Sequence, residues 1–481
     1  MNPLAVLMPG FEGTTLPGWV EEHLREGMAG VCLFATNVDS PAQLRELTGA
    51  IYAANPHAIV AIDEEGGDVT RLYQAVGSPF PGNAILGRLD DEALTEAVGA
   101  HVGQELAAVG VGMTFAPDAD VNSTALNPVI GVRSFSADPD VASRHTAAWV
   151  RGVEATGVAS CAKHFPGHGS TVQDSHHSLP RIDVDTATLD RRELPPFAAA
   201  IAAGGRAIMS SHIMVPALDD NMPATFSRAI LRGVLRERMG FTGVVVSDAL
   251  DMAGASAGRG IPAAAAAALH GGCDLLCIGT ANTEGQMRDI AATIADAVAA
   301  GGLDHEEVSA TQRRVADLGR ELADARGTSL DRGGFTPGQV PGVTPEAVVR
   351  AFAVSERAHA LLAEARPRAL IRIETEASMA VGPSPWGPFA SSGVDTALTV
   401  TPESDLSRVA AAVPEGSLAV VIGRDNHRHG LARPVVNAVS VGHDVVTVDM
   451  GWPDPDAGLA DIATFGASRI AGEALLDLLG W

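Results

Sequence analysis

Several apolar segments of the sequence end in a side chain that can act as an acid, a base or a nucleophile. Asp63 ends AIVAID, Lys163 and His164 end VASCAKH, and Asp248 ends VVVSD. A single residue of this kind is commonly a helix cap or a satisfied core group. Five segments with such endings favour a shared site, because carboxylates, an ammonium and imidazoles together can bind and activate a polar substrate. The remaining members of this set are Asp118, Asp120 and His212.

The loop HFPGHGSTVQDSHHSLP carries Asp174 and His176 two positions apart. A carboxylate at this spacing can orient an imidazole and raise its basicity, which gives a general acid/base pair. The same loop offers His164 and His168 as further metal ligands, but a Pro-Gly pair separates these two histidines, so they cannot share one face of a helix. We therefore expect an acid/base dyad, no metal and no cofactor.

Lys163 is the only lysine among the 33 basic residues of the chain. Lysine and arginine differ in geometry and hydration, so one lysine in an arginine-rich chain marks a candidate site residue. A lysine at the end of a barrel strand could also form a Schiff base, as in an aldolase, with His164 as the base. Trapping with borohydride and a carbonyl substrate tests this alternative.

Eight short β-branched or apolar runs alternate with helical patterns between residues 3 and 279. This alternation predicts an α/β fold, a (β/α)8 barrel similar to the TIM barrel, in which catalytic groups lie at the carboxyl ends of the strands. The runs are residues 3–8, 30–34, 58–63, 111–116, 158–164, 206–212, 243–248 and 274–279.

The barrel pattern ends with a predicted helix over residues 303–325, whose apolar face consists of Val308, Val315, Leu318 and Leu322. The stretch GTSLDRGGFTPGQVPGVTP then breaks every periodicity, which predicts a linker. Beyond it, RALIRI, TALTV, LAVVIG and DVVTVDMG are strands of the buried type, separated by helical stretches. We predict a catalytic barrel, a linker and a small α/β sandwich domain at residues 1–326, 327–345 and 346–481.

The composition narrows the class of protein. The chain has 481 residues, of which 46% are hydrophobic and 19% charged, as is typical of a globular protein. Its net charge of −25 would repel nucleic acid and anionic membranes. No apolar stretch reaches the roughly twenty residues of a membrane-spanning helix, and Pro9-Gly10 interrupts the N-terminal run too early for a signal peptide. We expect a cytoplasmic protein with buried, reduced cysteines.

Four motifs together resemble family 3 glycoside hydrolases of the N-acetyl-β-glucosaminidase type. They are IDEEGGDVTRL, NPVIGVRSF, KHFPGHGST with DSH, and VVVSDALDM. The match is ordered along residues 1–325, and the long KHFPGHG…DSH element is specific to this group. The resemblance implies a barrel enzyme that acts on a small carbohydrate, an N-acetylglucosaminide, with an attached sandwich domain.

Carried over residue by residue, the resemblance implies that Asp248 is the nucleophile, His176 the general acid/base and Asp174 its partner. The expected reaction is retaining, exo-acting hydrolysis of terminal β-linked N-acetylglucosamine through a covalent glycosyl-enzyme. Since His176 is neutral when it activates the acceptor, a phosphorylase that uses inorganic phosphate is an alternative. The resemblance also implies a set of sugar-binding residues: Asp63, Arg71, Arg133, Lys163 and His164.

The chain departs from the family pattern at three positions beside the sugar-binding residues. It has Asp68 and Thr36 where arginine is common, and Ser170 where aspartate is common. These differences bear on the aglycone, for which a muropeptide, chitobiose and a glycoprotein fragment are all open, with cell-wall recycling or chitin breakdown as the corresponding roles. A sugar-binding protein without catalysis is a further alternative, but binding alone needs neither a nucleophile nor an acid/base dyad.

Overall fold

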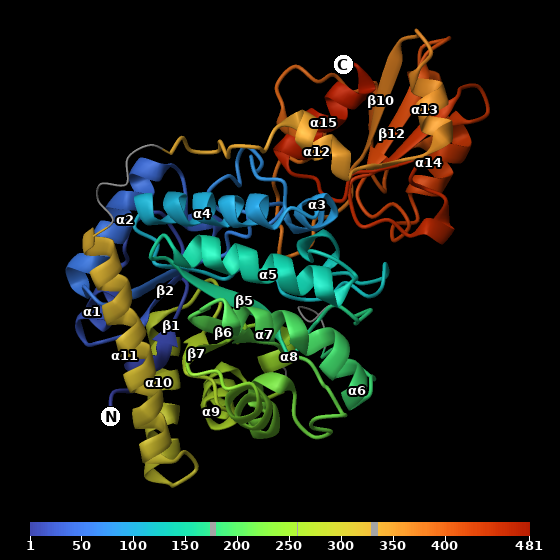
Figure 1. The fold of residues 1–481 in the computed structure, drawn as a ribbon. Coiled ribbons are helices and arrows are strands. Elements are labelled where there is room, and N and C mark those ends of the chain that lie inside the picture. Colours follow the sequence, from blue (N-terminus) through green and yellow to red (C-terminus); the bar gives the residue numbers. More distant parts are fainter. Residues whose placement is uncertain (174–178, 257, 329–334) are drawn as a thin grey trace. The chain divides into compact units, whose positions relative to one another are not determined.

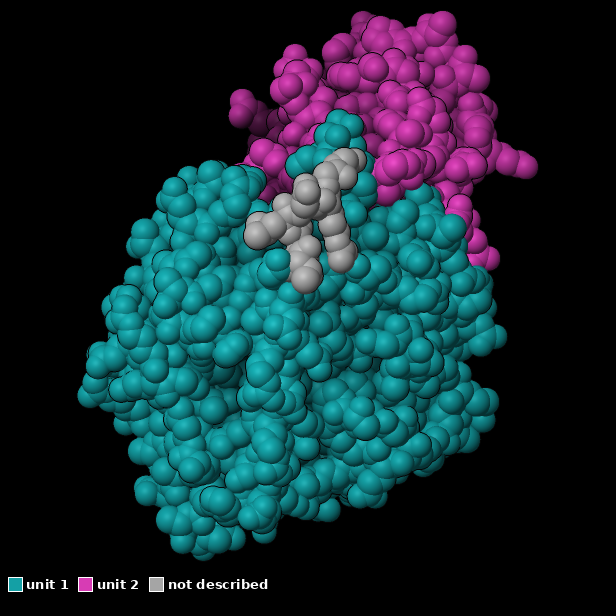
Figure 2. All heavy atoms as spheres, turned by 60° about the vertical axis from the view of Figure 1, so that its left-hand side comes forward, with its two compact units in different colours: residues 1–65, 92–130, 134–339 teal, residues 66–91, 131–133, 340–481 magenta. Residues whose placement is uncertain are grey.

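The structure is a computed structural model that describes residues 1–173, 179–256, 258–328 and 335–481 (Figure 1). The chain divides into two compact units (Figure 2). The first consists of residues 1–65, 92–130 and 134–339, and the second of residues 66–91, 131–133 and 340–481. The second unit thus includes two segments from the barrel part of the sequence, and the predicted domain boundaries stay a prediction.

In the described part of the first unit, eight parallel strands follow one another in the order β1-β8-β7-β6-β5-β4-β3-β2. The N–H of Cys32 in β2 donates to the carbonyl of Pro9, just after β1, at 3.0 Å, which closes the ring. The predicted (β/α)8 barrel is confirmed. Its strands are β1 (Leu7–Met8), β2 (Gly30–Leu33), β3 (Ile59–Ile62), β4 (Met113–Thr114), β5 (Ala159–Phe165), β6 (Ala207–Ser210), β7 (Val244–Ser247) and β8 (Leu275–Cys277).

Helices surround these strands (Figure 1), and local capping residues explain where several of them begin. The Ser40 side chain accepts the N–H of Gln43, and Pro41 occupies the first helical position of α2, where its missing N–H costs nothing. The longer helices are α1 (Gly18–Arg25), α2 (Pro41–Ala54), α4 (Glu92–Ala108), α5 (Pro139–Glu154), α7 (Leu194–Ala202), α9 (Ile261–Gly271), α10 (Glu284–Ala299) and α11 (His305–Thr328). Further helical elements are α6 (Thr186–Thr188), α8 (Ala253–Ser256) and two π-helices, Leu189–Glu193 and Ala229–Arg238.

Apolar side chains fill the barrel. Every residue of β2, β3, β5 and β7 is buried, as expected for parallel strands covered on both sides. Val315, Leu318 and Leu322 of α11 belong to the same buried cluster as residues from all eight strands. The apolar face predicted for this helix is confirmed, and its remaining member Val308 is also buried. All four cysteines are buried thiols.

The second unit contains a six-stranded sheet in the order β11-β10-β12-β13-β14-β9, in which β9 runs antiparallel to β14 and the other pairs are parallel. Four of its strands lie in the four predicted segments, whereas the two-residue strands β9 and β14 were not predicted. The strands are β9 (Ala353–Val354), β10 (Arg368–Ile373), β11 (Leu398–Val400), β12 (Leu418–Gly423), β13 (Val445–Asp449) and β14 (Ile462–Ala463).

Both faces of this sheet are covered, because alternate side chains of a strand point to opposite faces. Leu370 and Val420 join one buried cluster with residues of α15, and Ile371 and Val421 join another with Val435 of α14. This arrangement confirms the predicted α/β sandwich. Its helices are α3 (Asn83–Leu89), α12 (Pro345–Val348), α13 (Glu356–Leu362), α14 (Ala432–Val439) and α15 (Arg469–Leu479). Among the described residues of the whole chain, no helix has the length and apolar character needed to cross a membrane.

Asp449 makes the stability of the second unit depend on pH. Its carboxylate accepts the N–H groups of Asp425, Asn426 and Gly451 at 2.8, 3.0 and 2.8 Å. Burial and the nearby charge of Asp425 raise the pKa of Asp449 from 3.8 to about 7. Because the folded state binds this proton more tightly, the stabilisation is full below the unfolded value and is lost as the pH rises through the folded pKa.

We therefore expect the free energy of unfolding of the wild type to fall, relative to that of Asp449→Asn, as the pH rises from about 4 to about 7. Urea denaturation of both proteins at a series of pH values measures this difference. The comparison uses the slope with pH, so a constant loss of stability from the substitution does not affect it. Parallel profiles for the two proteins would contradict the expectation.

Candidate active site

Lys163 in β5 lies between two carboxylates that follow β3. Its Nζ is 2.8 Å from Asp63 Oδ1 and 2.8 Å from Glu65 Oε1. The side chains of Lys163 and Glu65 are each only 3% exposed, whereas that of Asp63 is 19% exposed. Two adjacent carboxylates stabilise the charged ammonium. This environment suits a fixed positive donor and disfavours the neutral amine that a Schiff-base lysine needs.

Replacing Lys163 by methionine should destabilise the first unit by about 3–5 kcal/mol, because it leaves two carboxylates next to each other without their shared cation. Urea denaturation measures the change. Arg181→Met is the matched control, since its ion pair with Asp183 at 2.7 Å has side chains that are 49% and 69% exposed. Such a pair contributes about 0–1 kcal/mol. Equal losses for the two variants would show that Lys163 is not held as described.

Asp120 orients the imidazole of His164, the next residue of β5. His164 Nδ1 is 2.7 Å from Asp120 Oδ2, and the same carboxylate accepts the backbone N–H of His168 at 2.6 Å. Asp118 Oδ1 in turn accepts the N–H of Asp120 at 3.0 Å. The contact to a carboxylate places the proton of a neutral His164 ring on Nδ1 and fixes the orientation of the ring.

Asp118, Asp120 and His164 are also the one group among the described residues whose ligand atoms lie close enough to hold a metal ion, within 4.8 Å of one another. The hydrogen bonds just described already use the Asp120 carboxylate and the Nδ1 atom of His164. A metal at this position would have to replace them. We therefore interpret the group as a support for the His164 ring.

Asp248 directly follows β7, and its Oδ1 accepts the N–H of Ala249 at 2.8 Å. His212, which follows β6, binds the carbonyl of the same residue, Ala249: its Nε2 is 3.0 Å from that carbonyl oxygen, and its Nδ1 is 2.9 Å from Thr225 Oγ1. Since a carbonyl can only accept, Nε2 carries the proton. The fully buried His212 is thus a positioning residue for the segment that carries Asp248.

The buried thiol of Cys161 in β5 is affected by charges at the ends of several strands. Burial raises the pKa of Cys161, the charge of Lys163 lowers it, and the charges of Asp63 and Asp248 raise it. Three groups from β3, β5 and β7 are thus close enough to act on a single sulfur. Burial raises the pKa of Asp251 as well, and the charge of Asp248 adds to that shift. The structure thus pairs Lys163 with Asp63 at 2.8 Å, and it places Asp248 directly after β7 of the same barrel.

The other predicted site residues are not placed in this group. Arg71 and Arg133 belong to the second unit, where both are buried. Arg71 Nη2 donates to the Ala380 carbonyl at 2.8 Å, within that unit. Asp174 and His176 lie outside the described residues.

The sequence pattern did not identify Glu65, and it did not show which group Asp120 binds. Glu65, the second carboxylate on Lys163, is the third of three consecutive acidic residues, and no spacing rule says which of them pairs with a lysine 98 positions away. Asp120 was noted as an ionisable residue at a strand end, but its bond to His164 needs the fold. The position of Glu65 shortly after a buried strand is the feature of the sequence that could have identified it.

Fold and site together define an enzyme of the (β/α)8-barrel class. The model of the family described as "Glycosyl hydrolase family 3 N terminal domain" matches residues 18–318. The chain belongs to glycoside hydrolase family 3, as the sequence motifs predicted.

Known proteins of this family are similar over different parts of the chain. Beta-hexosaminidase A of Pseudoalteromonas piscicida is 38% identical over 64% of this chain, which spans 56% of that protein. Beta-hexosaminidase of Chromobacterium violaceum is 40% identical over 58% of this chain and 78% of its own length. The solved structure of a family 3 β-N-acetylglucosaminidase from Paenibacillus sp. str. FPU-7 covers 99% of this chain and 96% of its own, with 28% identity and a TM-score of 0.87. Both units therefore have a counterpart in one known structure.

Proposed function

We propose that the protein is a retaining, exo-acting β-N-acetylglucosaminidase that hydrolyses terminal β-linked N-acetylglucosamine. The observation that carries this proposal is the ion pair between Lys163 of β5 and Asp63 at the end of β3, in the same barrel whose strand β7 is followed by Asp248. The relatives named above support it, since they are described as β-hexosaminidases and a β-N-acetylglucosaminidase. The substrate class is a small carbohydrate.

In this proposal Asp248 attacks the anomeric carbon and forms a covalent glycosyl-enzyme. Retaining glycosidases need the nucleophile about 5 Å from the proton donor. A strand end provides a rigid position, and His212 and the Ala249 N–H restrict the segment further.

His176 is the proposed general acid/base, with Asp174 holding its tautomer. An imidazole has an unperturbed pKa of about 6.5, so it can donate a proton to the leaving oxygen and later accept one from water near neutral pH. The assignment of these two roles rests on the DSH motif of the sequence and on membership of the family. Water is the proposed acceptor, and the phosphorylase alternative differs from it only in the second half-reaction.

Sugar recognition is proposed for the groups that can accept and donate several hydrogen bonds. Asp63 is held by Lys163 on one side and is partly exposed, so its carboxylate can accept from two hydroxyls of one sugar. Lys163 and His164 supply donors next to it, and Arg71 and Arg133 are proposed to contribute from the second unit. The ion pairs of Lys163 with two carboxylates disfavour the Schiff-base alternative. The cytoplasmic location stays a prediction from the sequence.

A panel of nitrophenyl glycosides tests the proposal. We expect the specificity constant for the β-N-acetylglucosaminide to exceed that for the β-glucoside, and the product to be free N-acetylglucosamine. The same assay with rising phosphate concentration distinguishes the two acceptors. An equal or better glucoside would contradict the substrate assignment, and N-acetylglucosamine 1-phosphate as the main product at millimolar phosphate would replace hydrolase by phosphorylase.

A further inference from the structure

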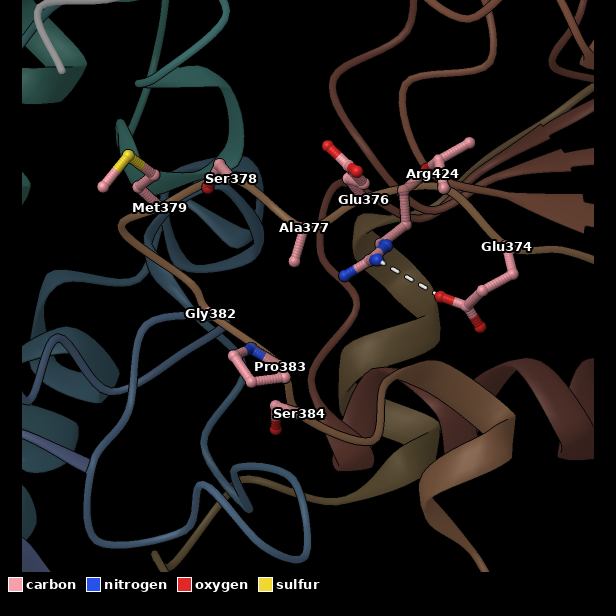
Figure 3. Close-up of a pocket in the computed structure, with 10 residues that line it drawn as sticks. Glu374, Glu376, Ala377, Ser378, Met379, Gly382, Pro383, Ser384 and Arg424 are labelled. Carbon is pink, nitrogen blue, oxygen red and sulfur yellow. Dashed lines mark ion pairs between the residues drawn. The ribbon is translucent and has the colours of Figure 1, made fainter. Parts of the chain in front are cut away.

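Arg424 and Glu193 are largely buried charged side chains that the proposed mechanism does not use. In the second unit, Arg424 lines a cavity of about 610 Å³ and points toward Glu374, whose Oε1 is 3.7 Å from Arg424 Nη2 (Figure 3). The carboxylates of Asp68, Glu374 and Asp425 all act on this guanidinium, so its charge is compensated within that unit. In the first unit, Glu193 contacts the segment that follows β5, next to residues of the candidate active site.

The Glu193 side chain is buried at the end of the π-helix Leu189–Glu193, directly before α7. It has no exposed surface, whereas the side chain of its partner Arg192 is 26% exposed. Arg192 Nη2 and Nε lie 2.7 and 2.8 Å from the same oxygen, Oε1. Burial raises the pKa of Glu193, and the charge of Arg192 lowers it. This ion pair therefore occupies one oxygen of the carboxylate.

The other oxygen, Oε2, lies against the segment after β5. A Cβ atom at Gly167 would be 2.8 Å from Oε2 and 2.9 Å from Glu193 Cβ, so even alanine does not fit there. In the described part of the chain, neither Oε2 nor the buried Ser170 Oγ has a partner with regular hydrogen-bond geometry. The Ser170 hydroxyl nevertheless lowers the pKa of Glu193 as a hydrogen-bond donor. These two groups are thus close enough to satisfy each other.

The next turn of the same helix supports this segment as well. Phe197 of α7 packs edge-on against Phe165, the last residue of β5, with the ring centroids 5.3 Å apart. Phe197 is four positions after Glu193, and residues at this spacing are neighbours on a helix surface. The helix therefore presents a carboxylate and an aromatic ring to residues 165–170.

The loop after β4 provides a second set of contacts to segment 165–170. The Ser123 N–H donates to the Gly169 carbonyl at 3.2 Å, and Asn127 Nδ2 donates to the His168 carbonyl at 2.9 Å. Two elements that are separate in the sequence thus hold one short segment, one through backbone carbonyls and the other through the Glu193 carboxylate. Loss of the carboxylate should leave the segment held from the β4 loop alone.

Burying an ion pair is costly, and well-packed apolar residues of similar volume often stabilise a protein as well or better. Stability alone therefore does not explain a carboxylate at this place. We propose that Glu193 is a positioning residue for the glycosidase reaction, which holds segment 165–170 in one arrangement. The proposed sugar-binding residue His164 directly precedes this segment, and Asp174 and His176 follow it in the sequence. The inference rests on the proposed function, because the acid/base dyad is assigned there.

A comparison of Glu193→Leu with Glu154→Leu in the full chain tests this role. Glu154 is a matched control, because its carboxylate is 14% exposed and lies 2.6 Å from Arg206 Nε. It accepts the N–H of Ser160 at the start of β5, at the end of the strand opposite to the site. We expect Glu193→Leu to slow a methyl β-N-acetylglucosaminide, which has a poor leaving group, at least tenfold more than the nitrophenyl glycoside. Glu154→Leu should slow both substrates by the same factor, as a merely structural change would.

Two further variants separate shape from charge. Glu193→Gln keeps the size of the side chain and an oxygen that can accept from Ser170, so the ratio of the two rates should stay within threefold of that of the wild type. Glu193→Asp keeps the charge but is one methylene shorter, so it should show the defect of the leucine variant, which preserves the test if that variant does not fold. A wild-type ratio in Glu193→Leu or, where that variant does not fold, in Glu193→Asp would overturn the proposal, as would a glutamine variant as impaired as the leucine variant.

His176→Ala, assayed with the same two substrates, distinguishes failure of this inference from failure of the proposed function. If its losses are equal for both substrates, the acid assignment is wrong and the role of Glu193 fails with it. If His176→Ala affects the methyl glycoside selectively while the Glu193 variants keep the wild-type ratio, only the positioning role is overturned.

Discussion

Replacing Asp248 by alanine is expected to lower the turnover of every N-acetylglucosaminide by at least about 10⁴-fold, whatever the leaving group, because loss of a nucleophile leaves no route through the covalent intermediate. Urea denaturation of the variant checks that the fold is kept, since the Asp248 side chain also accepts the N–H of Ala249. Turnover of nitrophenyl and natural substrates by purified variants measures the loss. Asp289→Ala, at an exposed carboxylate on α10, is the control and should retain full activity.

The alanine variant also offers a second measurement. A small anion such as azide can enter the space that the carboxylate leaves and attack in its place. We expect azide to restore turnover of a nitrophenyl substrate and to give a glycosyl azide of inverted configuration. If the variant keeps more than about one per cent of wild-type activity without azide, Asp248 is not the nucleophile.

Replacing His176 by alanine is expected to slow substrates with poor leaving groups by about 10²- to 10⁴-fold and to affect nitrophenyl substrates far less, because only a basic leaving oxygen needs a proton. Asp174→Ala should follow the same pattern more mildly, since the imidazole remains but loses its orienting partner. The measurement is the dependence of the rate on the pKa of the leaving group. His177→Ala, the neighbouring histidine in the sequence, is the matched control and should keep the wild-type dependence. Equal losses for all leaving groups in His176→Ala would indicate a structural role.

The barrel and the core of the site could be predicted because both follow from local patterns. Buried parallel strands produce apolar runs that end in a polar residue, and in a barrel all such ends meet at one face. This rule groups Asp63, Lys163 and Asp248 from the sequence, and the ion pair of Lys163 with Asp63 joins two of these strand ends. The single lysine of the chain was a further signal, and it lies where two carboxylates require a cation.

Contacts between residues far apart in the sequence could not be predicted in this way. The bond between His212 and the Ala249 carbonyl joins two strand ends whose relative height in the barrel is set by packing. The assignment of residues 66–91 to the second unit is a similar case. This segment follows β3 in the sequence, but Ile85 of α3 packs in the same buried cluster as the sheet of the second unit. Arg71 belongs to that unit for the same reason.

The structure shows what Asp68 does at the position where arginine is common in the family. Its Oδ1 accepts the N–H of Ala467 at 2.9 Å, so the carboxylate fixes a turn of the second unit just before α15. An arginine at this position could not accept that bond. The sequence alone could identify the difference from the family pattern but could not show which backbone group the new side chain binds.

The most direct test of the central claim is to trap the glycosyl-enzyme with a slow, fluorinated N-acetylglucosamine donor and to locate the label by mass spectrometry. Trypsin should release residues 239–259, because Arg238 and Arg259 are the basic residues on either side. This peptide contains both Asp248 and Asp251, so fragmentation is needed to assign the modified carboxylate. We predict one sugar per chain on Asp248. A label on Asp251 or on any other carboxylate, or turnover of the donor with no adduct under conditions that trap a known retaining enzyme, would contradict the proposed mechanism.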